Sequence, residues 1–145
     1  METGLILPDV EEVDSAPFWA ATRQEKLVVQ RCDACGRLRF PPHPFCSACR
    51  GEAVSWTEVS GRGRIWSYLV HHNPTLPAYS AFAPFPVIVV ELDEDRRLRI
   101  SGNVVAKPGA AINSVDPAAL RVGMPVRVTF QQVAEDVTLP YWMLA

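Results

Sequence analysis

The chain has 145 residues, 48% of them hydrophobic, so it can bury a core as one compact domain or as a small module plus a larger one. Its formal net charge of −2 excludes the strong basic excess of a general nucleic-acid binder. No apolar run approaches the roughly 18 residues of a membrane-spanning helix, and the acidic residues 1–14 do not resemble a secretory signal peptide. We expect a flexible N-terminus and a cytoplasmic protein.

The first helix is expected to begin after Ser15, a capping residue placed just before a proline in the first helical turn. Phe18 and Trp19 follow and predict a short amphipathic helix running to about Glu25. Its aromatic side chains either pack on this chain or lie against a partner. The β-rich run at 27–31 then leads directly to the first cysteine.

Four cysteines form two pairs, Cys32-x-x-Cys35 and Cys46-x-x-Cys49, separated by ten residues. Two intervening residues let both sulfurs of a pair face one point from a tight turn, and ten residues allow a hairpin that brings the two turns together. This spacing is typical of a tetrahedral Zn²⁺ site closed by four thiolates. Such a site has no open coordination position, so we expect it to hold the fold and to perform no chemistry.

Other interpretations of the cysteines remain open. Iron also binds in tetrahedral thiolate sites, and disulfides or free thiols would use the same residues. Disulfides suit small secreted proteins, and a thioredoxin-like dithiol needs only one pair in a βαβ setting, so structural zinc is favoured over iron and over both alternatives. Gly36 and Gly51 follow the two pairs, at positions where such a turn often needs a positive φ.

From residue 54 the hydrophobic pattern has a period of about two, which predicts strands. The expected strands span residues 55–60, 63–71, 86–92, 97–104 and 126–131. Gly61-Arg62-Gly63 is expected to bend or bulge between the first two, and residues 116–120 to form one helical turn before the last. This arrangement predicts a small five-stranded Greek-key barrel, the OB-fold.

The expected fold is therefore mainly β, with a helix and a rubredoxin-like zinc ribbon at 15–53 and an OB-fold with an apolar tail at 54–145. The loop at 72–84 is longer than a hairpin needs, and loops beyond about 12 residues are commonly functional or mobile. The tail at 139–144 either folds back over the barrel or enters another subunit. Aromatic side chains of the helix, loop and tail are the expected partner contacts: Phe18, Trp19, Tyr79, Phe82, Tyr141 and Trp142.

Residues 31–66 are rich in arginine, with six arginines and three acidic residues. This local excess of three could meet an anionic ligand, such as the phosphates of a nucleotide-like group, or form an ordinary solvated surface.

No specific catalytic set is present, so we expect no active site in this chain. His71 and His72 at a strand end would project to opposite faces, so at most one could serve a site. Glu91 and Asp93 share a strand face and could pair as acid and base, although they resemble part of a solvated turn. A modest hydrolase or lyase activity using His71 or His72 with Glu91 remains a further hypothesis.

Nearly the whole chain, from Phe18 onward, resembles one known family. The matching motifs are Phe18-Trp19, Leu27-Val28-Val29-Gln30-Arg31-Cys32-x-x-Cys35-Gly36, Pro41-Pro42, Cys46-x-x-Cys49, Gly61-x-Gly63-x-Ile65-x-Ser67-Tyr68, Pro86, Glu91-Leu92-Asp93 and Gly123-Met124-Pro125-Val126-x-Val128. They resemble the acyl-CoA-associated family of a zinc ribbon plus an OB-fold, long described as domain of unknown function 35.

The resemblance implies an accessory subunit of thiolase-superfamily enzymes, which include acyl-CoA thiolases, hydroxymethylglutaryl-CoA synthase and lipid-transfer-protein-type aldolases of steroid side-chain degradation. In such assemblies the partner carries the main catalytic residues, while this subunit docks, stabilises it and can shape the acyl-CoA channel. Only the four cysteines are carried over, as metal ligands, and no CoA contact is assigned. The alternative is a single-stranded nucleic-acid-binding module, since OB-folds often bind single strands.

Overall fold

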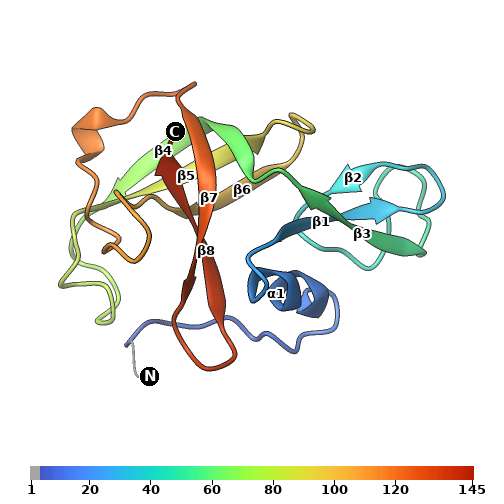
Figure 1. Cartoon of the computed structure of the whole chain (residues 1–145), viewed down its shortest axis with the longest axis horizontal. Helices are drawn as coiled ribbons and strands as arrows, with labels where there is room; N and C mark the ends of the chain where they lie inside the picture. Colours follow the sequence, from blue (N-terminus) through green and yellow to red (C-terminus); the bar gives the residue numbers. More distant parts are fainter. Residues whose placement is uncertain (1–3) are drawn as a thin grey trace.

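A computed structural model describes residues 4–145, which fold as a small sheet and a barrel joined where β3 of the small sheet bends into β4 of the barrel (Figure 1). In chain order the elements are α1 (Ala16–Thr22), β1 (Leu27–Cys32), β2 (Leu38–Arg39), β3 (Val54–Val59), β4 (Arg62–His71), β5 (Phe85–Leu92), β6 (Arg99–Asn103), the 3-10 turn η1 (Pro117–Ala119), β7 (Pro125–Gln132) and β8 (Thr138–Leu144). The mainly β class, with a helix and ribbon before an OB-like sheet, is confirmed.

The N-terminal segment is only partly covered by this description. Residues 1–3 of the stretch expected to be flexible lie outside the described residues. Residues 4–14 contain no helix or strand, but Pro8, Asp9 and Glu12 line a groove shared with Phe18 and Trp19. Within residues 4–145, no helix is long and apolar enough to cross a bilayer.

The small sheet is the ribbon, with strand order β2-β1-β3. β1 pairs with β3 over its whole length, from Leu27 opposite Val59 to Cys32 opposite Val54. The strand expected at 55–60 therefore pairs within the ribbon sheet and not within the five-stranded sheet. Period-two alternation identifies a half-buried strand but not the neighbour with which it pairs.

The barrel is a five-stranded sheet of order β6-β5-β4-β7-β8. Its fifth strand is the apolar tail, because β8 pairs with β7 from Thr138 opposite Gln132 to Leu144 opposite Val126. A parallel bridge between Val104 and Trp142 closes the sheet, and the Val105 N–H donates to the Trp142 carbonyl at 2.8 Å. Of the two alternatives for the tail, the structure shows the one in which it folds back.

Two glycines let β4 pass between its neighbours. Gly61 has φ +74, and a Cβ there would collide with Val128 of β7. A Cβ on Gly63 would collide with the carbonyl oxygen of Glu91 on β5. The bend expected at these glycines is present, but the β-bulge lies further along, between Ile65 and Ser67.

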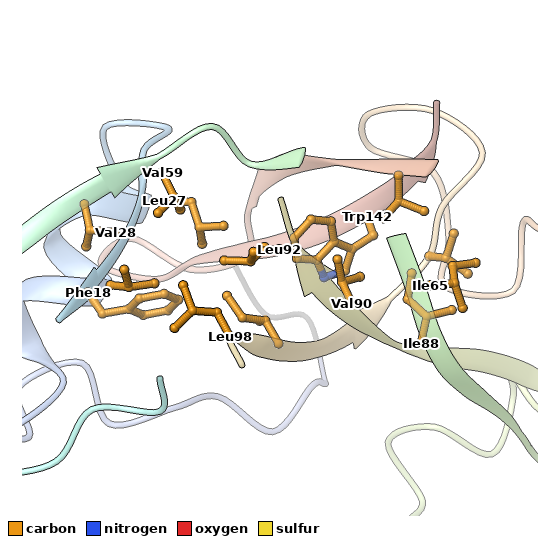
Figure 2. Close-up of a cluster of buried hydrophobic side chains, with 14 of the residues drawn as sticks. Phe18, Leu27, Val28, Val59, Ile65, Ile88, Val90, Leu92, Leu98 and Trp142 are labelled. Carbon is orange, nitrogen blue, oxygen red and sulfur yellow. The ribbon is translucent and has the colours of Figure 1, made fainter. Parts of the chain in front are cut away.

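One core is shared by the helix, ribbon and barrel. Trp142 is fully buried, and Figure 2 shows its ring beside Val90 and Leu92 of β5. Phe18 of α1 belongs to the same cluster, near Leu98. The aromatic side chains of α1 and β8 therefore stabilise this chain from within.

A second, smaller cluster lies on the other side of β8. Its buried members are Phe85, Val105, Ile112, Tyr141 and Met143. Tyr79 and Phe82 of the long loop pack against it and are partly buried. The loop at 72–84 thus covers part of the barrel wall.

Because Trp142 fills the centre of the main core, Trp142→Ala should lower the free energy of unfolding by about 3–5 kcal/mol. The matched control is Trp66→Ala, since Trp66 is 46% exposed, and this change should cost about 1 kcal/mol or less. Urea denaturation followed by circular dichroism measures both. Equal losses of stability in the two variants would contradict this packing.

Candidate metal centre and surface sites

The four cysteine sulfurs converge on one point. The Sγ atoms of Cys32 and Cys49 are 3.5 Å apart, and those of Cys35 and Cys46 are 3.7 Å apart. All four sulfurs lie within 4.8 Å of one another. Zn–S bonds of about 2.3 Å in a tetrahedron would place the sulfurs about 3.8 Å apart. The site therefore fits a single metal ion held by both knuckles.

Each knuckle is a tight turn closed by a backbone hydrogen bond of 2.8 Å. The Gly36 N–H donates to the Cys32 carbonyl, and the Arg50 N–H donates to the Cys46 carbonyl. Gly36 has φ +77, as expected, but in the second turn the positive φ belongs to Arg50, at +64. The expectation of a positive φ at Gly51 was therefore wrong by one position.

A small residue is favoured at position 51 because of the space around it and not because of its φ angle. A Cβ at this position would lie 3.3 Å from the Cys49 sulfur and 3.4 Å from the Cys32 sulfur. Its N–H also points to the Cys49 sulfur, at 3.4 Å. The residue gives the chain a close approach to the sulfur cluster.

Backbone N–H groups prepare two of the thiols to ionise. Hydrogen bonds from the backbone of Cys49 and then of Ala48 lower the pKa of Cys46 to about 6. The backbone of Cys35 similarly lowers the pKa of Cys32. Hydrogen bonding with Cys32 and burial outweigh the effect of the Gly51 N–H and raise the pKa of Cys49 to about 11. The thiolate is the form that binds metal. An all-sulfur donor set suits zinc and also accepts iron.

A buried polar group that the sequence did not reveal supports the second knuckle. Gln30 of β1 accepts hydrogen bonds through Oε1 from the Arg39 Nε–H at 2.7 Å and from the His43 N–H at 2.8 Å. Arg39 also donates to the His43 carbonyl at 3.0 Å. His43 is thus a loop residue held through its backbone. A glutamine within the apolar run of β1 was the available sign of this network.

The expected partner contacts divide into two groups. Phe18 and Tyr141 are 5% exposed and Trp142 is fully buried, so these three offer little or no surface to a partner. Trp19, Tyr79 and Phe82 are only partly buried. The structure thus leaves them some accessible surface.

Several large apolar side chains of β4 and of the loop after it are exposed to solvent. Trp66 is 46% exposed, Tyr68 37%, Leu69 52% and Leu76 56%. The sequence did not predict Leu69 as exposed, because the bulge at Trp66 changes which residues of β4 face the core.

The histidine–glutamate pair considered from the sequence, His71 with Glu91, is not formed. His71 lies opposite Phe85 and stacks on its ring with 5.1 Å between centroids. Glu91 lies opposite Arg64 and forms an ion pair with Arg96 at 3.0 Å. Phe85 and Glu91 are six residue steps apart on β5, which corresponds to about 20 Å along a strand. Adjacent His72 is an exposed loop residue.

Comparison with known families divides the chain near the start of β3. The ChsH2 rubredoxin-like zinc ribbon domain matches residues 19–55, and the ChsH2 C-terminal OB-fold domain matches residues 56–131. The chain belongs to the ChsH2 (DUF35) family. Metal binding by a zinc ribbon is thus supported by both the family and the sulfur geometry.

Several relatives carry functional names. The chain is 36% identical to a probable enoyl-CoA hydratase alpha subunit of Thermomonospora curvata over 88% of its own length. It is 33% identical, over 90% of its length, to the 3-oxo-4,17-pregnadiene-20-carboxyl-CoA hydratase alpha subunit of Mycobacterium tuberculosis. The chain spans only 36% of each of these relatives. Their activities therefore belong to larger proteins.

Other relatives have nearly the same extent as this chain. A DUF35 domain-containing scaffold protein of Methanothermobacter thermautotrophicus is 32% identical, over 76% of this chain and 75% of that protein. A chain of the solved Ltp2-ChsH2(DUF35) aldolase matches with a TM-score of 0.77 and 34% identity, covering 90% of this chain and 94% of that one. Homologues therefore occur as subunits of hetero-oligomeric enzymes.

Removing one ligand should release the metal and loosen the ribbon, because binding free energy at such sites is also folding free energy. We expect Cys35→Ser to lose most of the bound metal and to unfold at lower temperature than the unchanged chain. Ala48→Ser is the control, since it adds the same hydroxyl to an exposed knuckle position without removing a sulfur. Elemental analysis and thermal circular dichroism measure both properties. A near-native metal content and melting curve for Cys35→Ser would contradict the assignment.

Proposed function

We propose that this chain is a non-catalytic accessory subunit that docks on and stabilises a thiolase-superfamily enzyme and helps to form its acyl-CoA site. The match to a chain of the Ltp2-ChsH2(DUF35) aldolase carries this proposal, because it extends over 94% of that chain. A lipid-transfer-protein-type aldolase of steroid side-chain degradation is the favoured partner, and a thiolase is the second. The pregnadiene-carboxyl-CoA relative supports a steroid CoA thioester as the substrate class.

The chemistry of the described residues supports a partner with the active site. Four sulfurs complete a metal shell with no position for substrate. His71 at the end of β4 lies opposite Phe85, whereas Glu91 lies near the other end of β5. Residues 4–145 thus offer structure and surface but no recognised acid–base pair, and we propose that the ribbon holds a structural zinc ion.

The partner should be identified directly. We expect the tagged chain, purified from its native source under low-salt conditions, to retain a thiolase-fold subunit in fixed stoichiometry, identified by mass spectrometry. The purified pair should cleave or condense an acyl-CoA substrate, while the isolated chain should not. Activity of the isolated chain, or a stable complex with only a hydratase subunit, would reject the proposed partner.

We place the docking surface on Leu69, Leu76 and the exposed parts of Tyr79 and Phe82, because apolar and aromatic side chains form the cores of stable interfaces. Leu69→Asp with Leu76→Asp should weaken the affinity for the partner by about 100-fold, since the interface would then have to bury two charges. Both leucines are more than half exposed, so the melting temperature should hardly change. Val13→Asp is the control, because Val13 is 83% exposed on the N-terminal segment. Surface plasmon resonance with the purified partner measures the affinity of each variant. Equal affinities of the double leucine variant and of Val13→Asp would contradict this location of the interface.

A further inference from the structure

Three arginines meet on the outer face of the barrel. Arg62 of β4 lies directly opposite Arg127 of β7, and Arg64 follows two residues along the same face of β4. All three are exposed, and together they line a cavity of about 420 Å³. The backbone around Gly63, Val126 and Leu144 forms part of its wall.

The positive charges in this cavity form no ion pair among the described residues, although Glu91 lies directly opposite Arg64 on β5. Among residues 4–145, the salt bridges join Arg96 to Glu91 and Arg97 to Asp95, and none involves Arg62, Arg64 or Arg127. Asp93 is the acidic side chain that also lines the cavity. Like charges directly opposite one another destabilise a pair of strands. A negatively charged ligand would offset this repulsion.

The backbone of β4 that carries Arg62 and Arg64 is closely packed against the neighbouring strands. Gly61 and Gly63 flank Arg62 and leave no room for a Cβ against β7 and β5. The Arg64 guanidinium donates through Nη1 to the Gly123 carbonyl at 3.1 Å. A backbone held in this way fixes the spacing of the charges and lowers the entropy lost on binding.

An exposed aromatic ring lies next to the cavity. A smaller cavity of about 180 Å³ shares Arg64 and is lined by Trp66 and Val122. The Arg99 guanidinium stacks on the Trp66 ring at 3.8 Å from the centroid, and the ring remains 46% exposed. Charged donors beside an aromatic ring match a ligand with both phosphates and a planar base.

We propose that Arg62, Arg64 and Arg127 bind the phosphate groups of a small nucleotide-like ligand, with its base near Trp66. Guanidinium groups bind phosphate through paired hydrogen bonds, and the concave shape suits a compact ligand rather than an extended strand. The ligand is the adenosine bisphosphate part of a CoA thioester, an identity that rests on the proposed function. The phosphate site itself does not depend on it.

Isothermal titration of the 145-residue chain with pyrophosphate, adenosine 3′,5′-bisphosphate and CoA at low salt tests the site. We expect measurable binding of all three, and affinities about tenfold or more weaker in Arg62→Gln/Arg127→Gln. Arg23→Gln, which removes a positive charge near the end of α1, should leave the affinities within about twofold. Trp66→Ala should weaken binding of the bisphosphate but not of pyrophosphate, because only the former carries a base.

Several outcomes would overturn the proposal. The absence of binding at millimolar ligand, or an equal loss in Arg23→Gln, would reject the phosphate site. Tighter and more salt-sensitive binding of a dT12 oligonucleotide than of the bisphosphate would indicate that the site binds nucleic acid and not a small nucleotide. Loss of partner affinity in the double arginine variant, without phosphate binding by the unchanged chain, would assign the arginines to an acidic partner surface. Binding of phosphate without partner capture would instead reject only the accessory-subunit function.

Discussion

The hydrophobic core shared by the ribbon and the barrel is the constraint on which the rest of the structure depends. Leu27 and Val59 come from ribbon strands, whereas Leu98 and Trp142 come from the barrel, and all four belong to one buried cluster. Neither half can lose its packing without exposing apolar surface of the other. The four-sulfur centre lies at the far end of β1 from Leu27, so this strand connects the candidate metal site with the shared core.

The same core explains which parts of the fold the sequence could reveal. Cysteine spacing is a local property, so Cys32-x-x-Cys35 and Cys46-x-x-Cys49 predicted the metal site, and the sulfur positions agree. Strand partners are not local. The alternation in β3 predicts a strand but carries no information that it pairs with β1, and the apolar run of β8 reflects burial on both faces, with Tyr141 in one cluster and Trp142 in the other. A strand with two buried faces looks like a hydrophobic tail in the sequence.

Surface features were harder to predict for a related reason. The bulge at Trp66 changes the phase of β4, so alternation counted from Gly63 gives the wrong face for the residues after it. The pairing of Arg62 with Arg127 joins residues far apart in the chain. The sequence showed the excess of arginines near Arg62 and Arg64, but only the register of β7 adds the third one. The same register sets the distance between like charges.

The position of β4 links the two proposed surfaces. Its first residues, including Arg62 and Arg64, face the phosphate cavity, and its later residues include exposed Tyr68 and Leu69. Trp66 lies between them, at the bulge. A partner that buries the later part of β4 would stand beside the cavity and could supply another wall for it. Ligand binding and subunit docking would then share one strand whose backbone is fixed by close packing at Gly61 and Gly63. In the proposed function, this geometry would let the chain hold the charged end of a CoA ligand while the partner holds the acyl end.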